Sequence, residues 1–347
     1  MQDISQEHRK KDHIDLARKA QTSRVLVDNR FFYEPLMSAH PTDDCDIGTS
    51  FLGKKLKAPF WVSSMTGGVG EARHINQNLA RVAREFGLGM GLGSCRVLLD
   101  DQIDDQKKKM YFEDFNLRPI IGADLPLFAN LGIAQVEALL FSGDWQKITD
   151  LLGALEADGI IVHINPLQEW FQPEGDRFKY SPIETLSLLC SKISTKIIVK
   201  EVGQGMGPRS LKALLDLPIA ALELAAFGGT NFARLEQMRN PSQASWMQSL
   251  SLIGHTAPEM IQFLNDLLEK NPSYKQKEII ISGGIENALD GFNLMQKCHY
   301  SSVIGQAKNF LAHAENYDDL MHFVRSEIAG FKIAKTYLEI KTQECRE

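Results

Sequence analysis

The stretch IIVHINPLQEWFQPEGD, residues 160–176, starts as an apolar run and then sets four reactive or coordinating side chains close together. His163 carries an imidazole, which can transfer a proton or bind an anion near neutral pH. Glu169 offers the carboxylate oxygens that Mg2+ prefers. Asn165 and Gln168 are carboxamides, which do not titrate and can only orient a partner through hydrogen bonds. The cluster therefore combines groups for proton chemistry with groups for binding a metal and an anion.

Lys200 is the second residue whose position suggests chemistry. It ends the apolar run KIIVK, and a lysine cannot easily stay charged inside a core without a partner. Two interpretations remain open: an ion pair with Glu201 or Glu169, or a cation set against an anionic ligand or a cofactor ring.

Eight short apolar runs, separated by segments of helical periodicity, must position these groups. The predicted strands are 59–65, 87–94, 125–132, 159–165, 196–203, 220–229, 278–284 and 301–307. Helical patterns lie between them, among others at 74–86, 181–193, 258–270 and 287–298. Runs that are apolar throughout are typical of parallel strands covered on both faces, although the second and sixth runs are also compatible with helix. The pattern predicts an α/β fold, a (β/α)8 TIM barrel.

The predicted domain organisation is one catalytic barrel, residues 58–347, preceded by an N-terminal extension, residues 1–57. In this extension, residues 10–21 predict a short basic helix and residues 40–58 predict turns or a hairpin over the barrel floor. The basic segment is expected to contribute to substrate binding.

Polar residues or glycines end nearly every predicted strand, and in barrels these ends converge on one mouth. The mouth is expected to receive Ser64, Thr66, Gly67, Gly68, Ser94, Arg96, Asn130, His163, Asn165, Gln168, Glu169, Lys200, Glu201, Gly228, Gly229, Thr230, Asn231, Ser282, Gly283, Gly284, Gln306, Ala307 and Lys308. Glycine turns after strands seven and eight stand where barrels commonly hold a phosphate.

Composition excludes several classes of function. The 347 residues are 44% hydrophobic and 24% charged, which is ordinary globular usage. The net charge of −6 argues against general nucleic-acid binding, and no apolar run approaches the roughly 18 residues of a membrane span. Five scattered cysteines and the lack of a signal-peptide pattern lead us to expect a reducing cytoplasm. An anionic ligand must then be held by a local cluster.

The sequence resembles the type 2 isopentenyl-diphosphate isomerases, a flavin-dependent family of (β/α)8 barrels. The motifs that carry this resemblance cover nearly the whole barrel in the family's order, and the fourth-strand segment is the most specific of them. They are RKKDHI (9–14), MTGG (65–68), GLGSCR (91–96), ANLG (129–132), HINPLQEWFQPEGDRF (163–178), VKEVGQGM (199–206), GGTNFARLE (228–236) and SGGIENALD (282–290).

The resemblance implies FMN, Mg2+ and the interconversion of isopentenyl and dimethylallyl diphosphate. It places FMN on Met65, Thr66, Gly67, Ser94, Asn130, Lys200 and Thr230, and the FMN phosphate on Gly284, Ile285, Ala307 and Lys308. It places the substrate on Arg9, Lys10, Ser94, Cys95, Arg96, His163, Asn165 and Gln168, and the metal on Glu169. It also implies NADPH as the reductant and a homo-oligomer, either a tetramer or an octamer.

Isomerisation adds a proton at one carbon and removes one from another, without net redox change. We expect Gln168 to orient the substrate, and reduced flavin to supply the proton through its N5 with Lys200 beside the ring. His163 is expected to donate a hydrogen bond to the diphosphate, with an acid or base role as the rival. Gln168, His163 and Lys200 are thus the catalytic candidates.

Two departures from the family pattern bear on FMN and substrate binding. Glu286 stands where the family commonly has arginine at the phosphate, and we expect Lys308 to supply the missing positive charge. Cys95 replaces a usual glutamine and is expected to be inert packing.

Two alternative functions remain. A flavin barrel that transfers hydride would need a His-Arg pair near the end of strand seven, or a cysteine after strand six, and the sequence has neither there. A degenerate flavin-binding barrel should have lost polar strand ends, of which only the arginine is missing.

Overall fold

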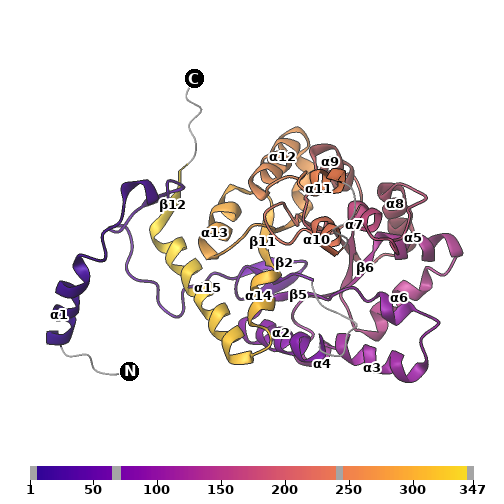
Figure 1. Ribbon diagram of the computed structural model, residues 1–347, viewed down its shortest axis with the longest axis horizontal. Helices are drawn as coiled ribbons and strands as arrows, with labels where there is room; N and C mark the ends of the chain where they lie inside the picture. The colour runs from indigo at the N-terminus through magenta and orange to yellow at the C-terminus, as the bar shows by residue number, and fades with distance from the viewer. Residues whose placement is uncertain (1–5, 65–71, 240–244, 342–347) are drawn as a thin grey trace. The chain divides into compact units, whose positions relative to one another are not determined.

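The computed structural model describes residues 6–64, 72–239 and 245–341. The chain divides into two compact units, one formed by His40–Thr336 and the other by Met1–Ala39 with Tyr337–Glu347. The larger unit is a closed barrel of eight parallel strands with helices around it (Figure 1). The predicted TIM barrel is confirmed.

All eight predicted strands are present in the barrel, in chain order around its wall. They are β4 (Phe60–Val62), β5 (Gly89–Gly91), β6 (Leu127–Gly132), β7 (Gly159–His163), β8 (Lys196–Lys200), β9 (Ala221–Glu223), β10 (Glu278–Ser282) and β11 (Ser301–Gln306). The two ambiguous runs form β5 and β9, which are strands of only three residues each. The residues that follow these two strands within each run belong to loops at the mouth, whereas Gly87, Leu88 and Ala220 precede the strands.

Some helices of the larger unit begin where the sequence supplies capping groups. Ser181 with Glu184, and Thr256 with Glu259, form capping boxes, and the Asn287 side chain accepts from the first turn of its helix. The helices of this unit are α2 (Ala72–Phe86), α3 (Asp105–Phe115), α4 (Arg118–Ile121), α5 (Ile133–Ser142), α6 (Gln146–Ala154), α7 (Pro166–Phe171), α8 (Pro182–Lys192), α9 (Pro208–Leu215), α10 (Phe232–Arg239), α11 (Ser245–Ser251), α12 (Ala257–Lys270), α13 (Ala288–Lys297), α14 (Lys308–His313) and α15 (Tyr317–Tyr337), with short 3-10 turns η2 (Arg96–Leu99) and η3 (Pro272–Gln276).

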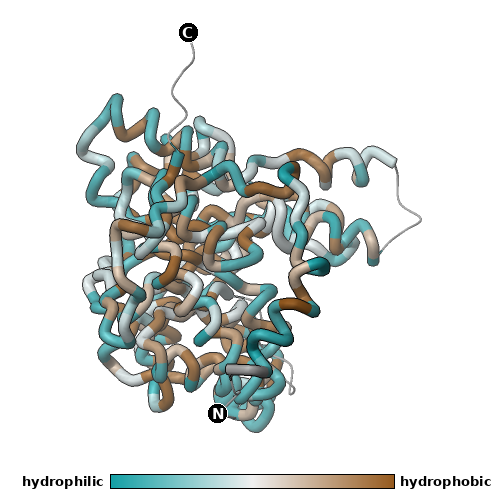
Figure 2. The backbone as a smooth tube through the Cα atoms, turned by 90° about the vertical axis from the view of Figure 1, so that its left-hand side faces the viewer, coloured by the Kyte–Doolittle hydropathy of each residue, from teal (hydrophilic) through white to brown (hydrophobic). Residues whose placement is uncertain are grey.

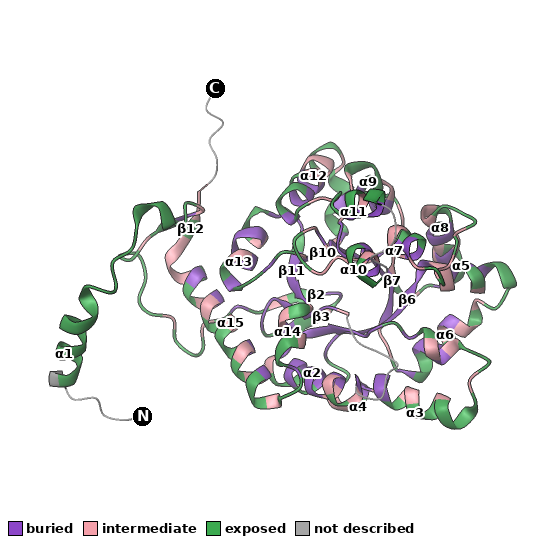
Figure 3. Cartoon of the chain, viewed as in Figure 1, coloured by how far each residue is buried: buried purple, intermediate pink, exposed green. Residues whose placement is uncertain are grey.

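The core lies inside the barrel and between its strands and helices. Trp61 is fully buried and packs edge-on against Phe51 and Phe128, with ring centroids 5.9 and 6.0 Å away. Buried residues follow the strands, whereas the helices around the barrel are buried on one side only (Figure 3). Hydrophobic and hydrophilic residues accordingly alternate along the helices (Figure 2).

The floor of the barrel is covered by the predicted hairpin, formed by β2 (Thr49–Phe51) and β3 (Lys54–Leu56). The backbone N–H of Leu52 donates to Glu278 at 2.8 Å, and Lys196 donates to the carbonyl of Leu52 at 2.5 Å. Lys54 forms an ion pair with Asp158 just before β7. These contacts join the hairpin to the N-terminal ends of the strands, at the end opposite the mouth.

The smaller unit contains the predicted basic helix, although it begins four residues earlier than expected. It comprises α1 (Gln6–Ala17), η1 (Arg24–Leu26), and an antiparallel pair of β1 (Phe31–Tyr33) with β12 (Leu338–Ile340). Arg9 and Lys10 lie on α1 and are exposed. No helix among the described residues is both long enough and apolar enough to span a bilayer.

Candidate active site at the mouth of the barrel

The strand register brings the polar residues of the mouth into neighbouring positions. His163 at the end of β7 pairs with Lys200 at the end of β8, and Lys200 pairs in turn with Glu223 at the end of β9. Asn130 lies on β6, and its side chain reaches the ring of His163. Residues far apart in the sequence thus form one continuous polar surface, because parallel strands in a barrel end at the same rim.

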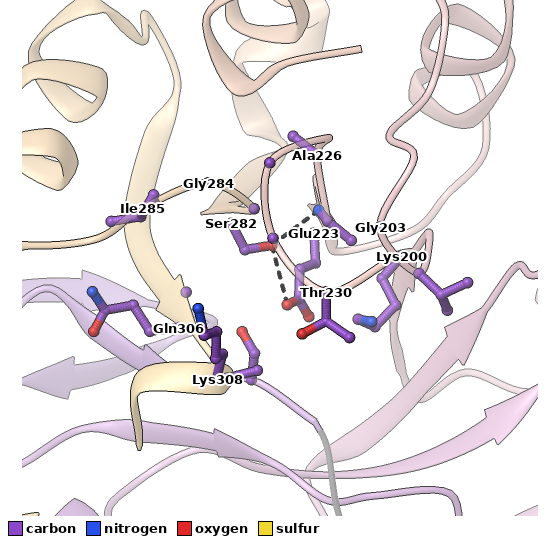
Figure 4. Close-up of a pocket in the computed structure, with 18 of the residues that line it drawn as sticks. Lys200, Gly203, Glu223, Ala226, Thr230, Ser282, Gly284, Ile285, Gln306 and Lys308 are labelled. Carbon is purple, nitrogen blue, oxygen red and sulfur yellow. Dashed lines mark hydrogen bonds between the residues drawn. The ribbon is translucent and has the colours of Figure 1, made fainter. Parts of the chain in front are cut away.

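A cavity of about 120 Å3 lies at this mouth between the ends of β8 to β11 and the start of the chain after β4. It is lined by six of the residues predicted to bind the cofactor: Lys200, Thr230, Gly284, Ile285, Ala307 and Lys308. Lys200 and Thr230 lie on one side of the cavity and Lys308 on the other (Figure 4). Met65, Thr66 and Gly67 lie outside the described residues, and Asn130 and Ser94 do not line this cavity.

Two glycine loops form one wall of the cavity by packing backbone against backbone. Gly283 has a φ of 93°, and a Cβ there would overlap the carbonyl oxygen of Ala226. Gly228 has a φ of 119°, and a Cβ there would lie 3.0 Å from the Cα of Gly284. Only glycine allows this approach, which leaves backbone groups rather than side chains facing the cavity.

Lys200 is buried, with 8% of its surface exposed, and donates to the carbonyl oxygen of Glu201 at 3.0 Å. The carboxylate of Glu201 is used elsewhere, because it accepts from the backbone N–H groups of Gln204 and Gly205. Burial raises the pKa of Glu201. No ion pair found in the described part of the chain involves Lys200. The structure therefore does not show the ion pair with Glu201 or Glu169 that the sequence left open.

The imidazole of His163 has a defined tautomer. Asn130 donates through its Nδ2 to the carbonyl of Leu92 at 3.1 Å, so its Oδ1 is the atom 2.8 Å from Nδ1 of His163. Nδ1–H must then donate to Asn130, which leaves Nε2 as an acceptor. Burial, followed by the positive charge of Lys200, lowers the pKa of His163 to about 3. The Nε2 atom of this neutral ring can accept a hydrogen bond, whereas the donation to a diphosphate that the sequence led us to expect would require a proton on Nε2.

We expect the substitution His163→Gln to remove a pH-dependent loss of stability. The imidazole has a pKa of about 6.5 in the unfolded chain, whereas its pKa in the folded chain is about 3. The folded state is therefore destabilised as the pH falls below about 6.5, by about 2 kcal/mol at pH 5. Urea unfolding at about pH 5 and pH 7.5 measures this loss. An equal loss in wild type and variant would contradict a neutral imidazole in the folded state.

Asn165, Gln168 and Glu169 form one hydrogen-bonded cluster at the start of α7. The Nδ2 of Asn165 lies 3.0 Å from Oε1 of Gln168 and 2.9 Å from Oε1 of Glu169. Glu169 is buried, and its other oxygen accepts from the backbone N–H of Asp176 at 2.7 Å. The Oδ1 of Asn165 is buried and has no hydrogen-bond partner among the described residues. The cluster is thus rich in oxygen atoms that still have capacity to bind.

Asp176 and Gln135 were missed by the sequence analysis, although Asp176 lies inside a quoted motif. The Oδ2 of Asp176 accepts from Arg96 at 3.1 Å and from Gln135 at 2.9 Å. Because the backbone of the same residue holds Glu169, Asp176 ties the expected diphosphate-binding arginine to the expected metal ligand. A Cβ on Gly132 would collide with Gln135 and lie 2.9 Å from Nε2 of His163. The side chains of Gln135 and His163 therefore both lie next to Gly132.

Ser94, Cys95 and Arg96 follow β5 with different exposures. Ser94 and Arg96 are exposed, whereas the Cys95 thiol is buried and donates to the carbonyl of Gly93. Burial raises the pKa of Cys95 to about 12, so the thiol stays protonated. Its side chain is fully buried, which fits a packing role.

Comparison with known proteins identifies the family. No protein-family model matches the sequence. The isopentenyl-diphosphate delta-isomerase of Rickettsia africae is 33% identical over 316 residues, which cover 90% of this chain and 87% of that protein. The barrel resembles a flavocytochrome b2 variant with sulfite bound (TM-score 0.61, 13% identity, 92% of this chain, 78% of that one). It also resembles a mandelate oxidase variant with a monooxide FMN adduct (TM-score 0.53, 11% identity, 90% and 88%). The chain belongs to the isopentenyl-diphosphate delta-isomerase family.

Proposed function

We propose that this protein is a type 2, FMN-dependent isomerase that interconverts isopentenyl diphosphate and dimethylallyl diphosphate. The observation that carries the proposal is the pairing of two sites at one barrel mouth. A cavity with glycine loops and Lys200 stands on one side, and the cluster around Glu169 stands on the other. His163, next to Lys200 in the register, joins the two. The relative's name supplies the reaction, and the FMN adduct of the mandelate oxidase supports the cofactor.

The cavity fits the expected cofactor at the chemical level. The close approach of Gly228 to Gly284 leaves backbone groups at the expected phosphate position, and Lys308 lines the same cavity. Glu286 also lines it and is exposed, so its carboxylate is free to turn toward solvent. Lys308 is then the side chain that supplies positive charge there. Reduced FMN bound here would supply a group at its N5 able to give and take a proton.

The oxygen cluster fits a Mg2+ site with one protein carboxylate. Mg2+ keeps several waters and is often held by one or two carboxylates together with substrate phosphates. Glu169 would bind the metal, and the unpartnered Oδ1 of Asn165 lies in the same cluster. Arg96, held by Asp176, would bind the diphosphate, and we propose the same role for Arg9 and Lys10 on α1.

Each remaining side chain of the mouth then has a role that its chemistry allows. Gln168 would orient the substrate through its amide, because it cannot titrate. His163 would present the lone pair of Nε2, since its Nδ1–H is committed to Asn130. Lys200 would hold its charge against the cofactor ring, since among the described residues its ammonium group donates to a carbonyl oxygen and forms no ion pair.

Hydride transfer is the competing function, because the similar solved structures include an oxidase. Such chemistry was expected to need a His-Arg pair near the end of the seventh barrel strand. β10 ends at Ser282, and the following residues, Gly283 to Glu286, include neither histidine nor arginine. This observation favours isomerisation over oxidation.

We expect the purified protein to bind FMN, turn yellow, and bleach when NADPH is added without oxygen. In that state it should convert isopentenyl diphosphate in the presence of Mg2+ and incorporate solvent deuterium in D2O. Product analysis by NMR measures both results. Absence of conversion by the reduced, FMN-loaded protein would refute the proposed function, and conversion without deuterium would refute the proton route.

The remaining proposals concern the cellular setting of the enzyme. Four cysteines of the described residues are free thiols, which supports a reducing cytoplasm as the location. We also propose NADPH as the physiological reductant and a homo-oligomer as the working assembly. The functional division into a substrate-binding extension, 1–57, and a catalytic barrel, 58–347, is part of the same proposal.

A further inference from the structure

Glu223 is a buried carboxylate at the mouth to which the proposed function gives no role. It ends β9, is 1% exposed, and lines the same cavity as Lys200. Its Oε1 accepts from the hydroxyl of Ser282 at 3.2 Å, whereas its Oε2 has no hydrogen-bond partner among the described residues. Lys200 is its register neighbour but donates to the carbonyl of Glu201 instead. A buried carboxylate oxygen without a donor calls for an explanation, since such groups are normally satisfied.

Three more buried polar groups of the same cavity share this property. The hydroxyls of Ser63 and Ser64 and the Oε1 of Gln306 have no partner among the described residues. We call these three residues and Glu223 the mouth cluster. Ser63 follows β4, Gln306 ends β11 and Glu223 ends β9, so the groups come from separate strands. Their common deficit points to one polar ligand that reaches all of them.

The chemistry of the mouth cluster restricts what that ligand can be. The free oxygens of Glu223 and Gln306 are acceptors, so the ligand must present donors. A phosphate or diphosphate offers acceptors and negative charge, which a carboxylate repels. Serine hydroxyls can donate or accept and therefore match groups that do both. A neutral chain carrying several hydroxyls meets all of these requirements.

We propose that the mouth cluster binds the polyhydroxylated chain that links the ring and the phosphate of the flavin, with Glu223 accepting a hydrogen bond from one hydroxyl. The inference rests on the proposed FMN cofactor. In Figure 4, Glu223 lies between Lys200 and Thr230 on one side and Gln306 and Lys308 on the other. This is the place for the linking chain if the ring lies by Lys200 and the phosphate by Lys308. Glu223 is thus a cofactor-positioning residue.

The test compares wild type with Glu223→Gln in binding FMN and its 2′-, 3′- and 4′-deoxy analogues, measured by quenching of flavin fluorescence. We expect the substitution to weaken FMN binding about tenfold, because a hydrogen bond to a charged acceptor is replaced by one to a neutral amide. We expect one of the three analogues to bind wild type and variant equally. Glu223→Asp should restore part of the affinity for FMN.

Glu137→Gln is the matched control for burial. Glu137 is 8% exposed on α5, and both of its oxygens accept from backbone N–H groups, those of Lys179 and Tyr180. This variant should lower thermal stability and leave FMN affinity unchanged. Unchanged FMN affinity in Glu223→Gln, or an equal loss for FMN and all three analogues, would overturn the inference while the proposed function stands. Failure of wild type to bind FMN would overturn both.

Discussion

Replacing Glu169 with glutamine is expected to lower kcat/KM for isopentenyl diphosphate about 1000-fold, a loss of about 4 kcal/mol in transition-state stabilisation. The carboxylate is buried, and its two oxygens are aimed by Asn165 and by the backbone of Asp176. Glutamine keeps the size of the side chain but removes the charge that holds Mg2+ against a diphosphate. The fold should survive, because the amide oxygen of glutamine can still accept one of these two hydrogen bonds and the volume of the side chain is unchanged.

Titration with Mg2+ distinguishes loss of the metal from a general loss of activity. The Glu169→Gln variant should need a higher Mg2+ concentration for half-maximal activity, while its affinity for FMN stays at the wild-type value. Glu174→Gln is the control, because Glu174 lies in the same segment but is exposed and pairs with Arg239. A Glu169→Gln enzyme with the wild-type Mg2+ requirement and rate would contradict the assignment of this residue as the metal ligand.

Replacing Lys200 with methionine is expected to lower kcat about 100-fold and to weaken FMN binding about tenfold. The ammonium group is buried beside the cavity, and no ion pair found in the described part of the chain involves it. A cation in such a place strongly favours a nearby anion, because screening by water is weak there. Methionine retains the length of the side chain and removes the charge.

The ionisation of bound reduced flavin gives the clearest measurement for this variant. The absorbance of the reduced, FMN-loaded protein should titrate at higher pH in Lys200→Met than in wild type, because the anionic form loses its neighbouring cation. Lys196→Met is the matched control at the other end of β8, where the lysine donates to Leu52 at the barrel floor. Identical titrations in wild type and Lys200→Met would contradict placement of this lysine at the cofactor ring.

Much of the barrel was predictable because the strands are apolar on both faces. Runs such as Ile279 to Ile281 have no polar side, which indicates a strand covered inside and outside. β5 and β9 were harder, since a three-residue strand shows no periodicity of its own. The start of α1 was also misplaced, because helix ends depend on local capping more than on the basic pattern.

The hydrogen-bonded cluster at the start of α7 was predictable because its reactive groups lie close together in the sequence. His163, Asn165, Gln168 and Glu169 lie within a stretch of seven residues and were recognised from residue type alone. Asp176 was not, because its meaning comes from Arg96 and Gln135, which lie 80 and 41 residues away. Motifs describe neighbours in the sequence, whereas this residue acts through neighbours in space.

By itself, the sequence determined which groups arrive at the barrel mouth. A parallel barrel sends every strand to the same rim, so the order of apolar runs and polar ends was sufficient. Only the tertiary structure decided how these groups are partnered. It committed Nδ1 of His163 to Asn130, gave Lys200 a carbonyl in place of a carboxylate, and left one oxygen of Glu223 without a donor. The physical reason is that hydrogen bonds and burial depend on distances of a few ångströms between residues that the sequence separates.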